Sequence, residues 1–249
     1  MRLTFLGTRA YVAAKNRRHR RFAAALVEAG GHRLMIDCGV GWGRRLPALA
    51  PEAIVLTHAH PDHAFGLGEG GAPPPAWATE ATFAVLEENR ISVERAGVLA
   101  PGRPVGVAGV TVAAFPVVHS VRAPAVGLRL SADGATVFYV PDLVDIEDRA
   151  GALAGVDLYI GDGSSPTRSL VRRTGERLVG HTSVRAQLGW LAPAGIRHAR
   201  FTHCGSAVIE GDERRLRPEL QAMAEARGLA EARYAHDGET LTLDRPARD

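Results

Sequence analysis

Four residues able to bind metal ions lie close together in the segment Thr57-His58-Ala59-His60-Pro61-Asp62-His63. Imidazole nitrogens and carboxylate oxygens are suited to zinc, manganese or iron. In an extended segment His58 and His60 project to the same side, so both can reach one ion. Asp62 and His63 come after a proline, where the chain must turn, and can face a second ion. We therefore expect two divalent metal ions, with zinc first and manganese or iron as alternatives.

The elements around this run should place it at the end of a buried strand. Residues Ala53–Thr57 form a continuous apolar run, which is typical of a strand buried on both faces. Before it we expect a strand at Arg2–Leu6. A hairpin should follow, formed by Phe22–Glu28 and Arg33–Asp37 and turned by Ala29-Gly30-Gly31.

The rest of the chain alternates strand-like and helix-like segments. Strands come in two batches, each followed by helices, and no linker is long enough to divide residues 1–249, so we expect a single domain. Two packed sheets with helices outside fit this order better than a parallel βαβ series. The other expected elements are a helix after Thr79, strands at Val110–Phe115, Val126–Leu130, Thr136–Val140 and Asp157–Ile160, a helix through Val184, Leu188 and Leu191, a strand at Arg200–Thr202, a helix within Asp212–Arg227 and a strand at Thr240–Leu243.

Composition excludes several classes of protein. A 46% hydrophobic and 23% charged chain of 249 residues is typical of a globular protein, and its net charge is only +3. Cys38 and Cys204 are too isolated for a disulfide framework or a cysteine-bound structural zinc. No apolar run approaches the roughly 20 residues of a membrane-spanning helix, and Met1 leads directly into a strand-like segment. We expect a cytoplasmic protein with no membrane contact.

The histidine-rich run resembles the metallo-β-lactamase superfamily, whose HxHxDH signature is matched at His58–His63 and continues to Gly66-Leu67. Residues Leu34–Gly39 look like the strand ending in Asp-x-Gly that supports the metal loop through Asp37. The later signature positions follow in order at His119, Asp142 and His203. The resemblance extends from Leu3 to about Leu243. It implies an α/β fold of this superfamily, the αβ/βα four-layer sandwich, in which two mixed sheets pack face to face with helices outside.

The resemblance also implies two sets of metal ligands and a bridge between them. Asp62 and Asp142 are then catalytic as well, because they help to hold the metals around a bridging hydroxide that acts as the nucleophile. One metal would be held by His58, His60 and His119, the other by Asp62, His63 and His203, and Asp142 would bridge the two.

The sequence Gly180-His181-Thr182-Ser183, followed by a helix, a strand and then Thr202-His203, resembles the phosphodiesterase branch of this superfamily. That branch includes RNase Z and the cyclic phosphodiesterase of phosphonate breakdown, and its members share an opening similar to Phe5-Leu6-Gly7-Thr8. The resemblance implies that His181 contacts the phosphate and protonates the leaving oxygen. The alternative is a structural or helix-capping histidine.

The spacing of the signature narrows the substrate. Only 22 residues separate His119 from Asp142, where RNase Z proteins insert an arm that grips tRNA. We therefore expect a small or cyclic phosphodiester, or a nucleic-acid end, as the substrate. A homodimer would agree with the dimers common in this branch. The alternatives are a thioesterase or lactonase of the same fold, and a non-catalytic nucleic-acid-binding protein.

One basic cluster, Lys15–Arg21, follows the opening strand. Charged runs are usually solvated, but a loop at the mouth of the site could attract phosphate or single-stranded nucleic acid. The candidate contacts in this loop are Arg17, Arg18, Arg20 and Arg21. Asp162 is expected to end a strand, with a substrate contact as an unsupported alternative.

Overall fold

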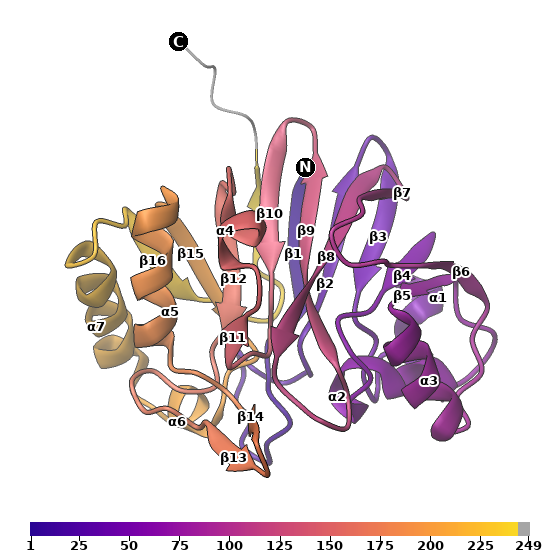
Figure 1. Cartoon of the computed structure of the whole chain (residues 1–249), viewed down its shortest axis with the longest axis horizontal. Helices are drawn as coiled ribbons and strands as arrows, with labels where there is room; N and C mark the ends of the chain where they lie inside the picture. The colour runs from indigo at the N-terminus through magenta and orange to yellow at the C-terminus, as the bar shows by residue number, and fades with distance from the viewer. Residues whose placement is uncertain (244–249) are drawn as a thin grey trace.

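The computed structural model describes residues 1–243, so the last six residues of the predicted domain lie outside the described part of the chain. Two sheets pack face to face with helices on their outer sides (Figure 1). The fold is the expected α/β sandwich.

The first sheet has the strand order β17-β1-β2-β3-β4-β5-β6. Strands β17 to β3 pair antiparallel, whereas β3 to β6 pair parallel, so the sheet is mixed. The hairpin expected at Gly30-Gly31 joins β2 to β3, and both glycines have positive φ angles. The strands are β1 (Arg2–Gly7), β2 (Ala24–Ala29), β3 (His32–Ile36), β4 (Ala53–Val55), β5 (Ala76–Ala78), β6 (Arg95–Val98) and β17 (Thr240–Thr242).

The second sheet repeats this mixture of pairings. Its order is β11-β8-β9-β10-β12-β15-β16, with β7 also paired to β8. Strands β11 to β10 pair antiparallel, and β10 to β16 pair parallel. The strands are β7 (Val105–Val107), β8 (Val110–Val118), β9 (Ala125–Ala132), β10 (Ala135–Tyr139), β11 (Asp145–Ile146), β12 (Leu158–Asp162), β15 (His198–Thr202) and β16 (Glu231–Tyr234). A separate hairpin, β13 (Arg172–Thr174) with β14 (Arg177–Val179), was not predicted.

Helices cover the outer faces of both sheets. Thr79 caps α3, the helix expected after it, and Ser183 caps α5, through side-chain oxygens that accept backbone N–H groups. Asp212 caps α7, which continues through Pro218. The helices are α1 (Leu46–Leu49), α2 (Pro61–Ala64), α3 (Glu80–Glu88), α4 (Arg149–Leu153), α5 (Val184–Leu191), α6 (Ser206–Ile209) and α7 (Glu213–Glu225), with short 3₁₀ turns at Gly43–Arg45, Phe65–Gly68 and Ala192–Ala194.

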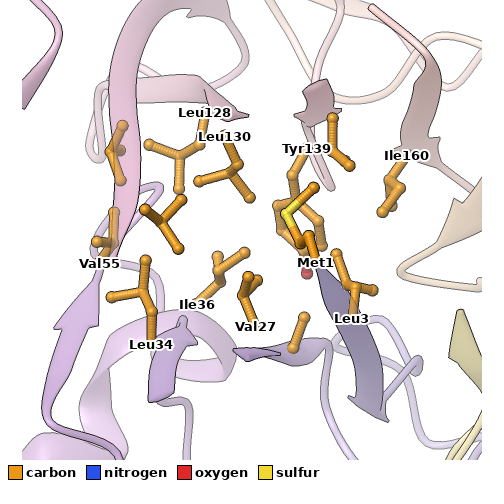
Figure 2. Packing of buried hydrophobic residues seen from close by; sticks show 14 of the residues in the cluster. Met1, Leu3, Val27, Leu34, Ile36, Val55, Leu128, Leu130, Tyr139 and Ile160 are labelled. Carbon is orange, nitrogen blue, oxygen red and sulfur yellow. The ribbon is translucent and has the colours of Figure 1, made fainter. Parts of the chain in front are cut away.

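Apolar side chains on both faces of the central strands explain their continuous hydrophobic runs. In β4, Val55 points into the core between the sheets and Ile54 points to the outer layer with Phe83. In β10, Tyr139 points inward and Phe138 points toward the outer helices. Figure 2 shows the inner core, where side chains from both sheets meet. No helix within residues 1–243 is long and apolar enough to cross a membrane.

Candidate metal centre

The strand ends of both sheets converge on one cluster of histidine and aspartate side chains. His58 follows β4, His119 follows β8, Asp142 follows β10 and His203 follows β15. This edge carries α2 and the β13–β14 hairpin, at the bottom of Figure 1. All seven predicted ligands lie in three overlapping groups whose ligand atoms are within 4.8 Å of one another. Their binding of ions stays a prediction.

The first group joins His58, His60 and His119, with Asp142 beside them. His58 Nε2 lies 3.0 Å from His60 Nδ1, and His119 Nε2 lies 3.3 Å from the same atom. Burial and the neighbouring imidazoles lower the pKa of each of these three histidines to about 4. They are therefore neutral near pH 7, which is the form that binds a metal ion.

The second group joins Asp62, His63 and His203. Asp62 Oδ2 lies 3.1 Å from His203 Nε2 and 3.3 Å from His63 Nε2. Burial alone would raise the pKa of Asp62, but His63 and His203 hold it well below its usual range. For His203 the effects are reversed. Burial alone would lower its pKa, but Asp142 and Asp62 raise it to about 10. The buried carboxylates thus favour positive charge in this group.

Asp142 lies between the two groups. Its Oδ2 is 3.0 Å from His63 Nε2 and 3.3 Å from His58 Nε2, and its Oδ1 is 2.7 Å from His203 Nδ1. Only 3% of the residue is exposed, which would raise the pKa of its carboxyl, yet the surrounding histidines hold it well below its usual value. This geometry is what a bridging carboxylate requires.

Two buried atoms test whether the cluster fits metal ions. His63 Nε2 and Asp142 Oδ1 lie 3.0 Å and 2.7 Å from other cluster atoms, but neither forms a well-directed hydrogen bond among the described residues, and a buried polar atom without one is costly. Both atoms face the other members of the cluster. Together with the nitrogen and oxygen donor set, they fit divalent cations such as zinc, manganese or iron.

Asp37 supports the segment Thr57–His63 through hydrogen bonds to both of its ends. Its Oδ2 accepts a hydrogen bond from His63 Nδ1 at 2.8 Å, and its Oδ1 accepts one from the Thr57 backbone N–H at 2.8 Å. Asp37 has a φ of 59°, a left-handed conformation that non-glycine residues rarely adopt. Gly39 completes the turn, because a Cβ there would collide with the Asp62 carbonyl. The expected supporting role of Asp37 agrees with these contacts.

His181 lies beside the ligands and contacts a residue whose role the sequence did not reveal. Its Nδ1 lies 2.8 Å from Asp162 Oδ2 and 3.4 Å from Asp142 Oδ1. Burial lowers the pKa of His181, but Asp162 outweighs burial and raises it. Asp162 ends β12 as expected and also accepts the Ser164 and Leu143 N–H groups. The only sequence signal for this role was an aspartate at the end of an apolar strand.

The cluster forms the floor of an open cavity of about 1100 Å³. His60, Asp62, His119, Asp142, His181 and His203 all line this cavity.

The basic loop is not at the mouth of this cavity. None of Arg17, Arg18, Arg20 and Arg21 is among its lining residues. The loop folds back because the Arg20 and Arg21 N–H groups donate to Asp237 Oδ2 at 2.9 and 3.1 Å. Arg18 forms an ion pair with Glu213 at 2.7 Å. The expected placement of this loop is therefore corrected, and these contacts are the reason.

Comparison with known proteins agrees with the fold and the signature. A family model described as the beta-lactamase superfamily domain matches residues 32–204, which is more than half of the chain. The chain belongs to this superfamily, and its fold is the metallo-β-lactamase fold. The family resemblance inferred from the sequence is confirmed.

Two relatives are ribonuclease Z proteins. The protein from Bradyrhizobium diazoefficiens is 47% identical over 70 residues, a match that covers 26% of this chain and 22% of that protein. The protein from Mycobacterium bovis is 26% identical over 260 residues, covering 87% of this chain and 90% of that one. Among solved structures, zinc-bound PqqB from Methylobacterium extorquens has a TM-score of 0.72 at 22% identity, covering 98% of this chain and 100% of that one.

Proposed function

We propose that this chain is a dinuclear-metal phosphodiesterase that acts on a small or cyclic phosphodiester or on a nucleic-acid end. The observation that carries the proposal is the position of His181. This histidine lines the cavity beside the ligand cluster and is held by a carboxylate that is itself buried. A lone metal cluster would serve many hydrolytic reactions, but an oriented, protonated histidine beside it suits a reaction with a poor leaving group.

Two divalent cations, zinc first, would be held by His58, His60 and His119 and by Asp62, His63 and His203, with Asp142 between them. When bound, such ions lower the pKa of water and neutralise charge on phosphate oxygens.

His181 is suited to act as the general acid. Because the Nδ1–H group donates a hydrogen bond to Asp162, Nε2 is the ring nitrogen that remains free to face a bound substrate. Asp162 raises the pKa of His181 and so favours the protonated imidazole, whose Nε2 would donate a proton to the departing alkoxide. Such proton transfer contributes about 10²–10⁴ to the rate.

The substrate class is supported by the relatives and by a short connection. Ribonuclease Z relatives make phosphodiester hydrolysis the first reaction to test. The chain between His119 and Asp142 forms only the strands β9 and β10 and their short connections, with no room for a tRNA-gripping arm there. We therefore favour a substrate that the enzyme can bind without such an arm. A cytoplasmic location and a homodimer stay predictions.

Two substitutions test the proposal with bis(p-nitrophenyl) phosphate. We expect His181→Ala to lower turnover by about 10²–10⁴ with metal content intact, because it removes the proton donor and no predicted ligand. Asp142→Ala should lose both metal and turnover, because its carboxylate contacts both ligand groups. Metal content is measured by elemental analysis of the purified proteins.

His198→Ala is the matched control, since this exposed histidine does not line the cavity. Full activity of His181→Ala would contradict the proposed general acid. Turnover of S-lactoylglutathione or an acyl-homoserine lactone, with none of phosphodiesters, would instead support the thioesterase or lactonase. Metal-free protein after purification and reconstitution would support the nucleic-acid-binding alternative.

A further inference from the structure

The mouth of the cavity differs in chemistry from its floor. Tyr11, Val121 and Leu170 line it, and they are three of the six large hydrophobic side chains exposed in the described part of the chain. Tyr11 is 63% exposed and lies against Phe22 with a ring-centroid distance of 5.4 Å. Exposed apolar side chains gathered around one opening indicate a surface that contacts a ligand.

Arg122, Arg168 and Arg172 line the same mouth. Apart from the predicted ligands and His181 on the floor, they are the only charged side chains among the cavity's lining residues. All three are exposed, and none forms an ion pair with any of residues 1–243. Guanidinium groups that form no ion pair give this opening a positive potential.

Backbone hydrogen bonds attach the segments that carry these arginines to residues of the site. Leu170 donates its N–H to the His181 carbonyl at 2.9 Å, and Gly180 donates to the His119 carbonyl at 2.9 Å. The base of the β13–β14 hairpin is thus hydrogen-bonded to two residues of the site. The Arg122 N–H donates to Ser120 Oγ at 3.2 Å, and Arg122 is three residues after His119.

We propose that the mouth binds a second phosphate group of the substrate, through Arg172 of the hairpin, Arg168 just before the hairpin, and Arg122. The proposal rests on the proposed function, in which the floor takes the scissile phosphodiester. The planar guanidinium fork matches the oxygens of a phosphate. The apolar side chains at the mouth would contact the organic group that links the two phosphates, as a nucleoside does.

The substrate class therefore becomes narrower. A phosphodiester bearing at least one further phosphate, such as a short or 5′-phosphorylated oligonucleotide end, uses both floor and mouth. A cyclic phosphodiester with a single phosphate uses the floor alone.

The dinucleotides TpT and 5′-phosphorylated pTpT test this, because they differ only by the terminal phosphate. With metal-reconstituted protein, we expect kcat/KM to be roughly tenfold higher for pTpT. Arg168→Gln combined with Arg172→Gln should bring the ratio close to one. Increased salt concentration should also lower the ratio.

Arg173→Gln combined with Arg177→Gln is the matched control. Both arginines belong to the same hairpin and are exposed, but neither lines the cavity. This pair removes the same charge and should keep the preference for pTpT. Equal treatment of the two dinucleotides by the unaltered protein would overturn the proposal, as would an equal effect of both double substitutions.

Calorimetric binding of TpT and pTpT to the metal-reconstituted His181→Ala variant separates this proposal from the proposed function. If the unaltered protein hydrolyses no phosphodiester but the variant still binds pTpT about tenfold more tightly than TpT, through Arg168 and Arg172, the second phosphate site is supported and the proposed reaction is contradicted. If TpT is hydrolysed and both dinucleotides bind equally, the reaction stands and the second site is overturned.

Discussion

The floor and the mouth of the cavity are built in opposite ways. On the floor, Asp142 and His63 are buried and each contacts several charged neighbours. At the mouth, Arg168 and Arg172 are exposed and have no ion-pair partner within the described chain. Burial with many partners fixes geometry, which suits the reacting groups. Exposed, unpaired charge leaves geometry adaptable, which suits the choice of substrate.

Asp162→Asn should have the largest effect on kcat among the substitutions described below, because Asp162 orients His181 on the floor of the cavity. The substitution keeps the shape of the side chain but removes the charge that holds His181. We expect kcat on bis(p-nitrophenyl) phosphate to fall about 10–100-fold, with little change in KM and with metal content retained. Steady-state kinetics and elemental analysis measure these quantities.

Asp157→Asn is the control, because Asp157 is exposed, does not line the cavity, and accepts a hydrogen bond from the Thr136 N–H in β10. An unchanged kcat in the Asp162 variant would mean that Asp162 does not orient His181. Loss of metal would assign it to the ligands instead.

Gly180→Ala tests the connection between floor and mouth. Gly180 has a φ of 108°, and a Cβ there would collide with the Leu170 carbonyl. We expect the free energy of unfolding to fall by about 1–3 kcal/mol, because an alanine is strained in this conformation. Urea unfolding measures the change.

Gly175→Ala is the comparison for that experiment. Gly175 also has a positive φ, 60°, but lies at the hairpin tip with open space around its Cα. Its substitution should cost less than that of Gly180. Equal losses would show that the contact between Gly180 and Leu170 adds nothing to the backbone strain.

Arg17→Gln combined with Arg20→Gln should have the smallest effect. Neither side chain lines the cavity, so kcat/KM for both TpT and pTpT should stay within about twofold of the unaltered value. A selective loss on pTpT would show that the basic loop, rather than the hairpin, binds the second phosphate.

The sequence predicted the core strands and the convergence of the ligands because both leave strong local patterns. Residues 53–56 are apolar and buried, and the histidine run follows directly after Thr57. By contrast, β13 and β14 have three residues each and are exposed except at Val179, so no hydrophobic period marks them. The contact of Asp162 with His181 depends on tertiary structure, since the two residues belong to different elements.

The two basic segments show the same limit. The density of arginine is greater in Lys15–Arg21 than at the mouth, yet Asp237 and Glu213 hold the former loop away from the cavity. Those carboxylates are distant in sequence. The density of basic residues in the sequence therefore did not show which arginines lack an ion-pair partner.

The hydrogen bond between His203 and Asp62 joins residues 141 positions apart, one following a strand of each sheet. A contact that closes so long a loop forms only after the two sheets have docked. The geometry of the ligand set thus depends on how the two sheets pack through the inner core, rather than on either sheet alone. A cavity-forming substitution such as Ile160→Ala, in that core, should weaken metal affinity even though it alters no ligand.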